Sequence, residues 1–303
     1  MDKELLNTRE LAQYLDINEK KIYTLILERG LPATKVTGKW LFPKHLVDIW
    51  IDNHIQNYPW MKEKKLDTFS ESLIIAGSND ILLANILGFF QKKNHNILPL
   101  YSSIGSMNGI QALKKGWCHI CATHMLQKED EDYNLSYIKD VFHEGFMMIN
   151  FAYRTQGLIL NAQNTKKIKG IEDITRPDIT IVNRQSGTGT RFLLEYELEK
   201  HGIDARNISG YDNICLNHLD VGIEILSGRA DLGLGIQAIA QMFGLTFIPM
   251  RKERFDFVFH QEFYSDLRFQ TFIKFLQSKE IMDYSRRFAG YDLMDIGKIL
   301  YKE

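Results

Sequence analysis

Short apolar runs alternate with helix-like segments from Leu73 onward, and this alternation restricts the fold more than any other feature. The run Leu73–Ala76 is followed by helical spacing over Ile81–Lys93, and Leu98–Ser102 with Met107–Lys114 repeats the unit. Strands that alternate with helices predict parallel sheets in an α/β domain. Further strands are expected at 119–123, 146–152, 157–160, 179–183, 230–235, 246–249 and 255–260, and helices at 190–201 and 218–227.

The beginning of the chain has a different pattern, with short helices followed by a hairpin. Thr8 is a suitable N-cap for a helix over Arg9–Leu15, and a second helix is expected over Glu19–Glu28. A hairpin of Ala33–Val36 and Trp40–Phe42 follows, with a third helix behind it. Two short helices with a tight turn, then a hairpin and a third helix, predict a winged helix-turn-helix, mainly α with one β-hairpin.

These patterns divide the chain into a winged helix-turn-helix over residues 1–52, a linker over 53–72 and a two-lobed domain over 73–303. The second lobe is expected at about 156–250, and the linker is polar and charged. No apolar stretch approaches the roughly 18 residues that span a bilayer. The N-terminus has no apolar signal core, and three cysteines fit a reducing compartment. We therefore expect a cytoplasmic protein with no membrane partner.

The second helix of a helix-turn-helix lies in the DNA major groove, with its first residues nearest the bases. The whole chain has a net charge of −1, but residues 18–44 hold six basic and two acidic residues, a local charge of +4. A patch this small binds phosphates weakly, so we expect a homodimer on a paired double-stranded operator. The alternative is a protein-interaction module with solvated lysines. The candidate DNA-binding residues are Asn18, Lys20, Lys21, Tyr23, Thr24, Lys35, Thr37 and Lys39.

A family resemblance supports the DNA-binding interpretation of this segment. Residues 5–52 resemble excisionase-type helix-turn-helix domains, which are related to the mercury-resistance-regulator class. The residues that carry the resemblance are Thr8–Glu10, Leu11, Ala12, Leu15, Ile22, Tyr23, Gly30–Pro32 and Trp40–Pro43.

The segment Val182–Arg191 is the most informative motif of the second domain, because it follows a strand and opens a helix. Its glycines let the backbone approach a ligand closely, and Ser186, Thr188 and Thr190 supply neutral donors. The free amides of a first helical turn and the helix dipole favour an anion. An N-capped helix after a glycine-rich turn is the alternative interpretation. The motif thus predicts a metal-free site for a small oxyanion or carboxylate.

Three more polar segments follow strands in the other half of the domain. They are Gly77–Asp80, Ser102–Ser106 and the pair Thr123 and His124. Ligands of open α/β sheets bind at such carboxyl ends of strands. The sequence therefore predicts two facing lobes with a ligand cleft between them.

At these residues the chain resembles the periplasmic-binding-protein-like domains of cytoplasmic regulators, a molybdate-binding-like group also found beside molybdenum-cofactor enzymes. The resemblance covers residues 73–292 and implies an α/β two-lobed, type II venus-flytrap fold. It implies no particular ligand, because this scaffold binds anions, amino acids and other metabolites. The matching segments are Gly77–Asn79, Tyr133, Asn134, Asn150–Leu158, Asn183–Arg191, Gly210, Tyr211 and Ser227–Gly235.

The resemblance also implies which residues line the cleft. Tyr153 is expected near the crossover between the lobes together with Arg154, and Arg184 or Arg191 would neutralise an anion. His218 is a further candidate, although a lone helical histidine is more often structural. The candidate ligand-binding residues are Ser78, Asn79, Ser103, Ser106, Thr123, Tyr153, Arg184, Ser186, Thr188, Thr190, Arg191 and His218.

Other patterns point away from metal sites and catalysis. Cys118 and Cys121 have the spacing of a metal or redox pair, but they overlap a predicted strand and no second pair exists, which favours a buried structural role. The sequence contains no Ser-His-Asp order, P-loop or paired-carboxylate spacing that compels an enzyme interpretation.

The sequence thus predicts a ligand-responsive transcription regulator that is not an enzyme and that uses no metal or cofactor. The expected effector is a small anion, with molybdate or tungstate as the first choice. One alternative is an organic carboxylate or aromatic metabolite. Another is an enzyme or accessory protein of molybdenum-cofactor metabolism, with the helix-turn-helix as a docking module.

Overall fold

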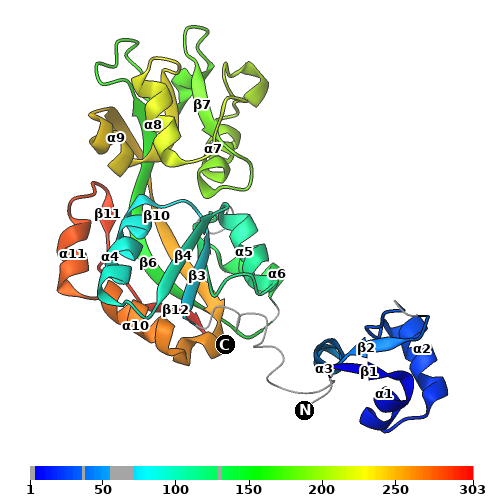
Figure 1. The fold of residues 1–303 in the computed structure, drawn as a ribbon. Helices are drawn as coiled ribbons and strands as arrows, with labels where there is room; N and C mark the ends of the chain where they lie inside the picture. The colour runs from blue at the N-terminus through cyan, green and yellow to red at the C-terminus, as the bar shows by residue number, and fades with distance from the viewer. Residues whose placement is uncertain (1–3, 36–37, 55–70, 128–131, 143, 303) are drawn as a thin grey trace. The chain divides into compact units, whose positions relative to one another are not determined.

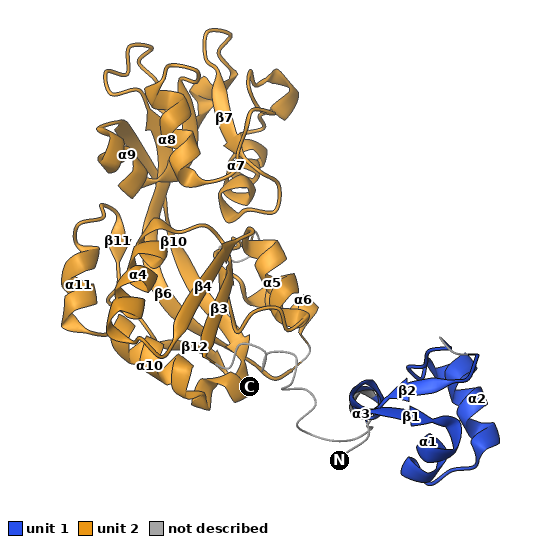
Figure 2. Ribbon diagram, in the orientation of Figure 1, with its two compact units in different colours: residues 1–65 blue, residues 66–303 orange. Residues whose placement is uncertain are grey.

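A computed structural model describes residues 4–35, 38–54, 71–127, 132–142 and 144–302. The chain forms two compact units, residues 1–65 and 66–303 (Figure 2). Most of the predicted linker, residues 55–70, lies outside the described residues, and so does Thr37 of the predicted DNA-binding set.

Unit 1 forms its helices where local capping signals dictate them. The expectation that Thr8 caps the first helix is wrong: Asn7 is the N-cap, its side chain accepts from the amide of Glu10, and the Glu10 carboxylate accepts from the amide of Asn7. Asn18 caps the second helix, and Gly30 ends it in a left-handed conformation at φ 62°. The elements are β1 (Leu5–Asn7), α1 (Thr8–Tyr14), α2 (Glu19–Arg29), β2 (Leu41–Pro43) and α3 (Lys44–Asn53).

The predicted hairpin is found in part, and Val36 of its first strand lies outside the described residues. Strand β2 pairs antiparallel with β1 at the start of the chain, with Leu6 opposite Phe42. Thr34 contributes only an isolated bridge to Leu41. Leu41 of β2 therefore has two antiparallel neighbours, Asn7 of β1 and Thr34. Pairing with β1 buries both Leu6 and Phe42 against the core of unit 1.

Unit 2 contains the strand–helix alternation expected from the sequence (Figure 1). Its strands are β3 (Ser72–Gly77), β4 (Leu98–Ser103), β5 (Ile120–Thr123), β6 (Phe146–Leu160), β7 (Ile181–Arg184), β8 (Ile214–Cys215), β9 (Leu232–Ile236), β10 (Thr246–His260), β11 (Tyr291–Asp292) and β12 (Ile299–Lys302). Its helices are α4 (Ile81–Lys93), α5 (Ser106–Lys114), α6 (Leu135–Val141), α7 (Gly189–Lys200), α8 (His218–Leu226), α9 (Gln237–Phe243), α10 (Leu267–Leu276) and α11 (Lys279–Ser285).

Two long strands correct the sequence expectation of four short ones. Strand β6 is continuous over Phe146–Leu160, and β10 is continuous over Thr246–His260. They pair antiparallel along almost their whole length, with register shifts between Pro249 and Arg251 and between Phe255 and Asp256. The residues between the expected short strands lie where β6 and β10 pass from one half of unit 2 to the other (Figure 1).

The two halves of unit 2 are called lobe 1 and lobe 2 below. Lobe 1 contains β3–β5, α4–α6, α10, α11, β11 and β12, and lobe 2 contains β7–β9 and α7–α9 (Figure 1). Both lobes share one sheet of order β4-β3-β5-β10-β6-β9-β7-β8, in which β6 and β10 run through the middle. Among the described residues, no helix has the length and apolar content needed to cross a membrane.

Candidate functional site

The N-terminal ends of four helices follow strands that end between the lobes. Asp80 caps α4, Thr188 caps α7 and Asn217 caps α8, while α5 begins after Gly105 without a side-chain cap. The lobes touch here: Asn79 Oδ1 accepts from the amide of His218 at 3.2 Å. Helix N-termini present unpaired amides and a partial positive charge. The buried polar residues around these helix ends, centred on Asp80, Arg154 and Glu253, are called the interlobe cluster below. The helix N-termini around it favour an anion.

Arg154 is the centre of the interlobe cluster. It comes from β6, is fully buried, and directs Nη1 to Asp80 Oδ2 at 2.6 Å. Its Nε donates to Glu253, which lies opposite it in the β6–β10 register, and its guanidinium stacks 4.4 Å from the centroid of the Phe255 ring. Although burial alone would raise the pKa of Glu253, Arg154 and His124 hold it below its usual value. Both buried carboxylates are therefore held as partners of one arginine.

Glu253 also organises the side chains around it. Its Oε2 contacts His124 Nδ1 at 2.7 Å and accepts from Gln156 Nε2 at 2.5 Å. Burial lowers the pKa of His124 despite the neighbouring carboxylate. The first residue of α7, Gly189, lies so close to His124 that an added Cβ would be 2.4 Å from its ring. His124 thus forms part of the contact between the lobes.

Arg184, at the end of β7, is a buried cation without a carboxylate partner among the described residues. It is 3% exposed, and its Nη2 donates to the Leu216 carbonyl at 3.0 Å. Its Nε and Nη1 have no hydrogen-bond partner in the described part of the chain. Burial, with the charge of Arg154 as the next cause, lowers the pKa of Arg184 to about 10. An unpaired buried cation is costly, so this position favours a bound anion.

Four more buried polar atoms of the interlobe region lack partners among the described residues. Arg154 Nη2 is a cationic donor, and His218 Nδ1 belongs to a ring whose pKa is lowered by burial and by Arg184. Gln156 Oε1 and Gln185 Oε1 are the other two. Buried polar groups are nearly always hydrogen-bonded in native proteins, so a set this dense calls for a partner from outside the chain.

Several residues predicted from sequence lie together in the interlobe cluster. The hydroxyls of Ser78 and Ser106 are 2.8 Å apart, and Ser106 Oγ also accepts from the amide of His124. Asn79, Arg184 and His218 have the contacts given above. Thr188 is buried at the start of α7, with its hydroxyl donating to the Gln185 carbonyl, and Thr190, two residues further along, is also buried.

Other predicted residues have partners elsewhere or lie exposed. Ser103 and Ser186 are exposed. Thr123 donates to Asn134 Oδ1 at 3.2 Å. Tyr153 contacts Asp295 at 3.4 Å. Arg191 pairs with Glu195 at 2.7 Å and lies over the Tyr211 ring.

Sequence reasoning missed four members of the cluster, namely Asp80, His124, Gln156 and Glu253, as ligand-site candidates. Arg154 and Gln156 are two residues apart in β6, and a period of two on a strand was the available signal that they share a face. Glu253 stands among Arg251, Lys252 and Arg254, a charged run with the appearance of a solvated segment. Only the pairing of β10 with β6 reveals that its carboxylate is buried.

The cysteines lie outside the interlobe cluster. Cys118 and Cys121 are buried, as predicted, and each is a free thiol. Burial raises the pKa of Cys118 to about 12, so it is not a reactive thiolate at neutral pH. Within the described residues, no group of three or more His, Cys, Asp or Glu side chains is arranged to hold a metal ion.

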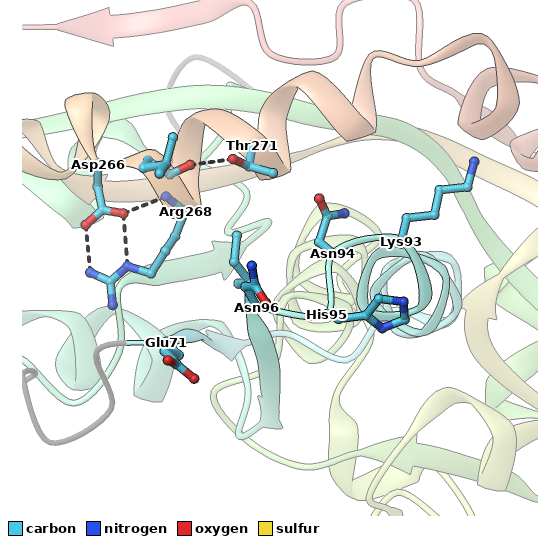
Figure 3. Close-up of a pocket in the computed structure, with 10 residues that line it drawn as sticks. Glu71, Lys93, Asn94, His95, Asn96, Asp266, Arg268 and Thr271 are labelled. Carbon is cyan, nitrogen blue, oxygen red and sulfur yellow. Dashed lines mark hydrogen bonds and ion pairs between the residues drawn. The ribbon is translucent and has the colours of Figure 1, made fainter.

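A surface pocket of about 710 Å³ lies in lobe 1, away from the predicted ligand-binding residues (Figure 3). The end of α4 and the residues after it line one side, including Lys93 and His95. The start of α10 lines the other, where Arg268 forms an ion pair with Asp266 at 2.7 Å. The pocket contains none of the unpartnered buried atoms, so we give the interlobe cluster priority as the candidate site.

The candidate DNA-binding surface lies on α2 of unit 1. Lys20, Lys21 and Tyr23 are exposed on this helix, and Thr24 is partly buried. Asn18 is its N-cap. Beyond the helix, Lys39 is exposed and Lys35 lies 5.5 Å from the centroid of the Trp40 ring. The buried face of α2 packs through Ile22, which leaves the lysines on the outer side.

Comparison with known proteins defines the class of the chain. The model of the PBP superfamily domain matches residues 87–277, more than half of the chain, and the chain belongs to this family. The model of a helix-turn-helix domain matches residues 5–54. The expected fold class is therefore confirmed: a helix-turn-helix domain precedes an α/β domain like the type II periplasmic binding proteins.

Relatives and solved structures agree with this class. The uncharacterized protein YvgK of Bacillus subtilis (strain 168) is 28% identical over 302 residues, 96% of both chains. A putative phosphate ABC transporter substrate-binding protein from Clostridium perfringens, with bound phosphate, has a TM-score of 0.55 at 18% identity and covers 71% of this chain and 97% of its own. A mutant of Corynebacterium glutamicum OxyR in its H2O2-bound form has a TM-score of 0.52 at 11% identity and covers 92% and 88%. At these identities the two structures establish the fold alone.

The buried histidines predict how stability depends on pH. Burial lowers the pKa of His119 to about 4, and it also lowers those of His124 and His218. The unfolded chain, with histidine pKa values near 6.5, takes up these protons first, so stability falls as the pH drops from about 7 toward 4. Burial raises the pKa of Asp256 to about 6. Between about pH 4 and 6 the folded chain therefore binds this proton before the unfolded chain does, which cancels part of the loss of stability caused by one histidine.

We expect the free energy of unfolding to fall by about 1–3 kcal/mol per pH unit below about pH 6.5. Urea denaturation of the full chain at about pH 7.5, 6.5 and 5.5 measures it. Equal free energies at the first and last of these pH values would contradict the prediction.

Proposed function

We propose that the protein is a ligand-responsive, DNA-binding transcription regulator whose interlobe cluster binds a small anion. The observation that carries the proposal is Arg184, a buried arginine whose Nε and Nη1 have no partner among the described residues. The helix-turn-helix domain ahead of a PBP-like domain supports a regulator, with a binding role rather than a catalytic one. Such a protein acts on DNA in the cytoplasm.

The anion enters between the lobes and supplies the acceptors that Arg184 and Arg154 lack. Contacts across the cleft, such as that between Asn79 and His218, form when the lobes close. Closure changes the arrangement of two helix-turn-helix domains in a homodimer and so changes affinity for a paired operator. Because the two binding events are linked, operator DNA changes the affinity for the anion by the same factor.

Two ligand classes follow from this site. Molybdate or tungstate is the first, supported by the resemblance to molybdate-binding-like domains and by a cluster rich in donors. An organic carboxylate or an aromatic metabolite is the second. Calorimetry of the full chain with molybdate, tungstate, sulfate and phosphate separates them. Binding of none of the four would refute the oxyanion version and leave the carboxylate version to a second titration series.

The DNA-binding surface is tested by the double change Lys20→Ala and Lys21→Ala. We expect a loss of at least about tenfold in DNA affinity and a weaker salt dependence, because each lysine lost removes a phosphate contact. Electrophoretic retardation or fluorescence anisotropy with genomic fragments at two salt concentrations measures it. A matched control changes Lys114 and Lys115, an exposed pair at the end of α5, to alanine. Equal DNA binding by both double variants would refute the assignment of α2.

A further inference from the structure

The amide of Gln156 has a fixed orientation in the interlobe cluster. Its Nε2 donates to Glu253 Oε2 at 2.5 Å, and a carboxylate can only accept, so the nitrogen must face Glu253. The carbonyl oxygen Oε1 is therefore an acceptor. Gln156 is fully buried, and this oxygen has no donor among the described residues.

Three neighbouring donor groups are already paired with buried carboxylates. His124 contacts Glu253 through Nδ1, and Arg154 donates Nε to Glu253 and Nη1 to Asp80. None of these groups can turn to Gln156 Oε1 without taking a hydrogen bond away from a buried carboxylate, which has a larger cost than an unpaired amide. Arg154 Nη2, the remaining N–H group of that guanidinium, makes no hydrogen bond to Gln156 Oε1 in the structure. A donor carried by a bound molecule would pair this oxygen and leave both buried carboxylates with their present partners.

The same cluster thus offers two opposite kinds of unpartnered group. Arg184 and Arg154 offer cationic N–H donors, and Gln156 offers a neutral carbonyl acceptor. Gln185, next to Arg184 in sequence, adds a second unpartnered Oε1. An anion that carries acceptors only satisfies the arginines but leaves these carbonyl oxygens buried and unpaired.

We propose that the interlobe cluster selects an anion that carries a hydrogen-bond donor of its own: an acid proton, a hydroxyl or an ammonium group. This inference rests on the proposed function, since it assumes that the cluster binds an anion. Hydrogen phosphate and 2-hydroxy- or 2-amino-carboxylates have both kinds of group. Sulfate, molybdate and tungstate at neutral pH have acceptors only. The inference therefore ranks molybdate and tungstate, the first ligand class proposed above, below hydrogen phosphate and the substituted carboxylates.

The test uses pairs of anions that differ in the donor alone. The full chain is titrated calorimetrically with phosphate against sulfate, with lactate against propionate, and with molybdate and tungstate. We expect phosphate or lactate to bind about 10- to 100-fold more tightly than its partner, since leaving a buried acceptor unpaired has a cost in this range. Preference within the phosphate pair or within the lactate pair identifies the source of the donor.

Gln156→Met tests the named residue, because methionine keeps the length of the side chain but removes the acceptor, together with the Nε2 donor to Glu253. We expect the preference within the pair to fall to about threefold or less. The control Gln91→Met changes an exposed glutamine of α4 and should keep the wild-type preference. If Gln156→Met does not fold, the wild-type pairs still decide the proposal.

Two negative results have different meanings. Sulfate or molybdate binding as tightly as phosphate and lactate would overturn this inference and leave the anion-binding regulator intact. If no anion of the panel binds, the proposed anion site is overturned, and this inference with it.

Discussion

Replacement of Arg154 by methionine is expected to lower the free energy of unfolding of unit 2 by about 3–5 kcal/mol. The arginine is fully buried and is the shared partner of Asp80 and Glu253, so its loss leaves two carboxylates buried without a cation. Methionine keeps much of the packing against Phe255. Urea denaturation of the full chain at neutral pH, followed by fluorescence and circular dichroism, measures the change.

A second substitution and a matched control give this prediction its specificity. Adding Glu253→Gln to the Arg154→Met variant should restore part of the stability, because it removes one of the two carboxylates that are buried without a cation. Arg229→Met breaks an exposed ion pair with Glu224, in which the arginine side chain is 59% exposed, and should cost less than about 1 kcal/mol. Similar losses for Arg154→Met and Arg229→Met would contradict the assignment of a buried cluster.

The change Gly189→Ala is expected to prevent full closure of the lobes. An alanine Cβ would lie 2.4 Å from the ring of His124 and 2.5 Å from its carbonyl oxygen, and Glu253 holds that ring in position. Gly189 lies outside the left-handed region, so backbone strain plays no part. If the variant populates the closed state to only about 1%, its apparent affinity for the anions of the panel falls by about 100-fold, and this is the loss that we expect.

Hydrogen exchange measures directly whether the two lobes of the Gly189→Ala variant are separated. The amide of His218 donates to Asn79 across the cleft, so peptides that contain it should exchange faster in Gly189→Ala. Gly88→Ala is the control, because Gly88 lies in α4 with nothing within 4 Å of its added Cβ. It should raise stability by about 0.5–1 kcal/mol and leave binding unchanged. Wild-type exchange and affinity in Gly189→Ala would refute the closure contact.

Local signals made much of the fold predictable from sequence. Helix α4 begins at the predicted residue because the side chain of Asp80 caps its first turn, and it also ends at Lys93 as predicted. Gly30 ends α2 as expected, since glycine adopts the left-handed conformation at no steric cost. The pairing of β2 with β1 was not predicted, because β1 is distant in sequence and the pairing is selected by burial of Leu6 against Phe42, not by a local turn.

The site was less predictable, because long-range pairing decides which polar residues are buried. Arg191 and Arg184 looked equivalent, yet Glu195 stands four residues after Arg191 on the same helix and forms an ion pair with it. Arg184 has no such neighbour within its own strand and is left with unpartnered nitrogens among the described residues. Glu253 could not be recognised at all, since only the β6–β10 register brings it opposite Arg154.

The continuity of β6 and β10 sets an order for folding during synthesis. Lobe 2 is built from the single stretch of chain between them, whereas lobe 1 joins two stretches, with Asp256 of β10 opposite Thr123 of β5. Pairings of such large sequence separation form slowly, and lobe 1 remains incomplete until β12 has left the ribosome and paired with β6. Unit 1 is finished long before then. A newly made chain therefore has its helix-turn-helix domain before it has a complete interlobe cluster with which to respond to a ligand.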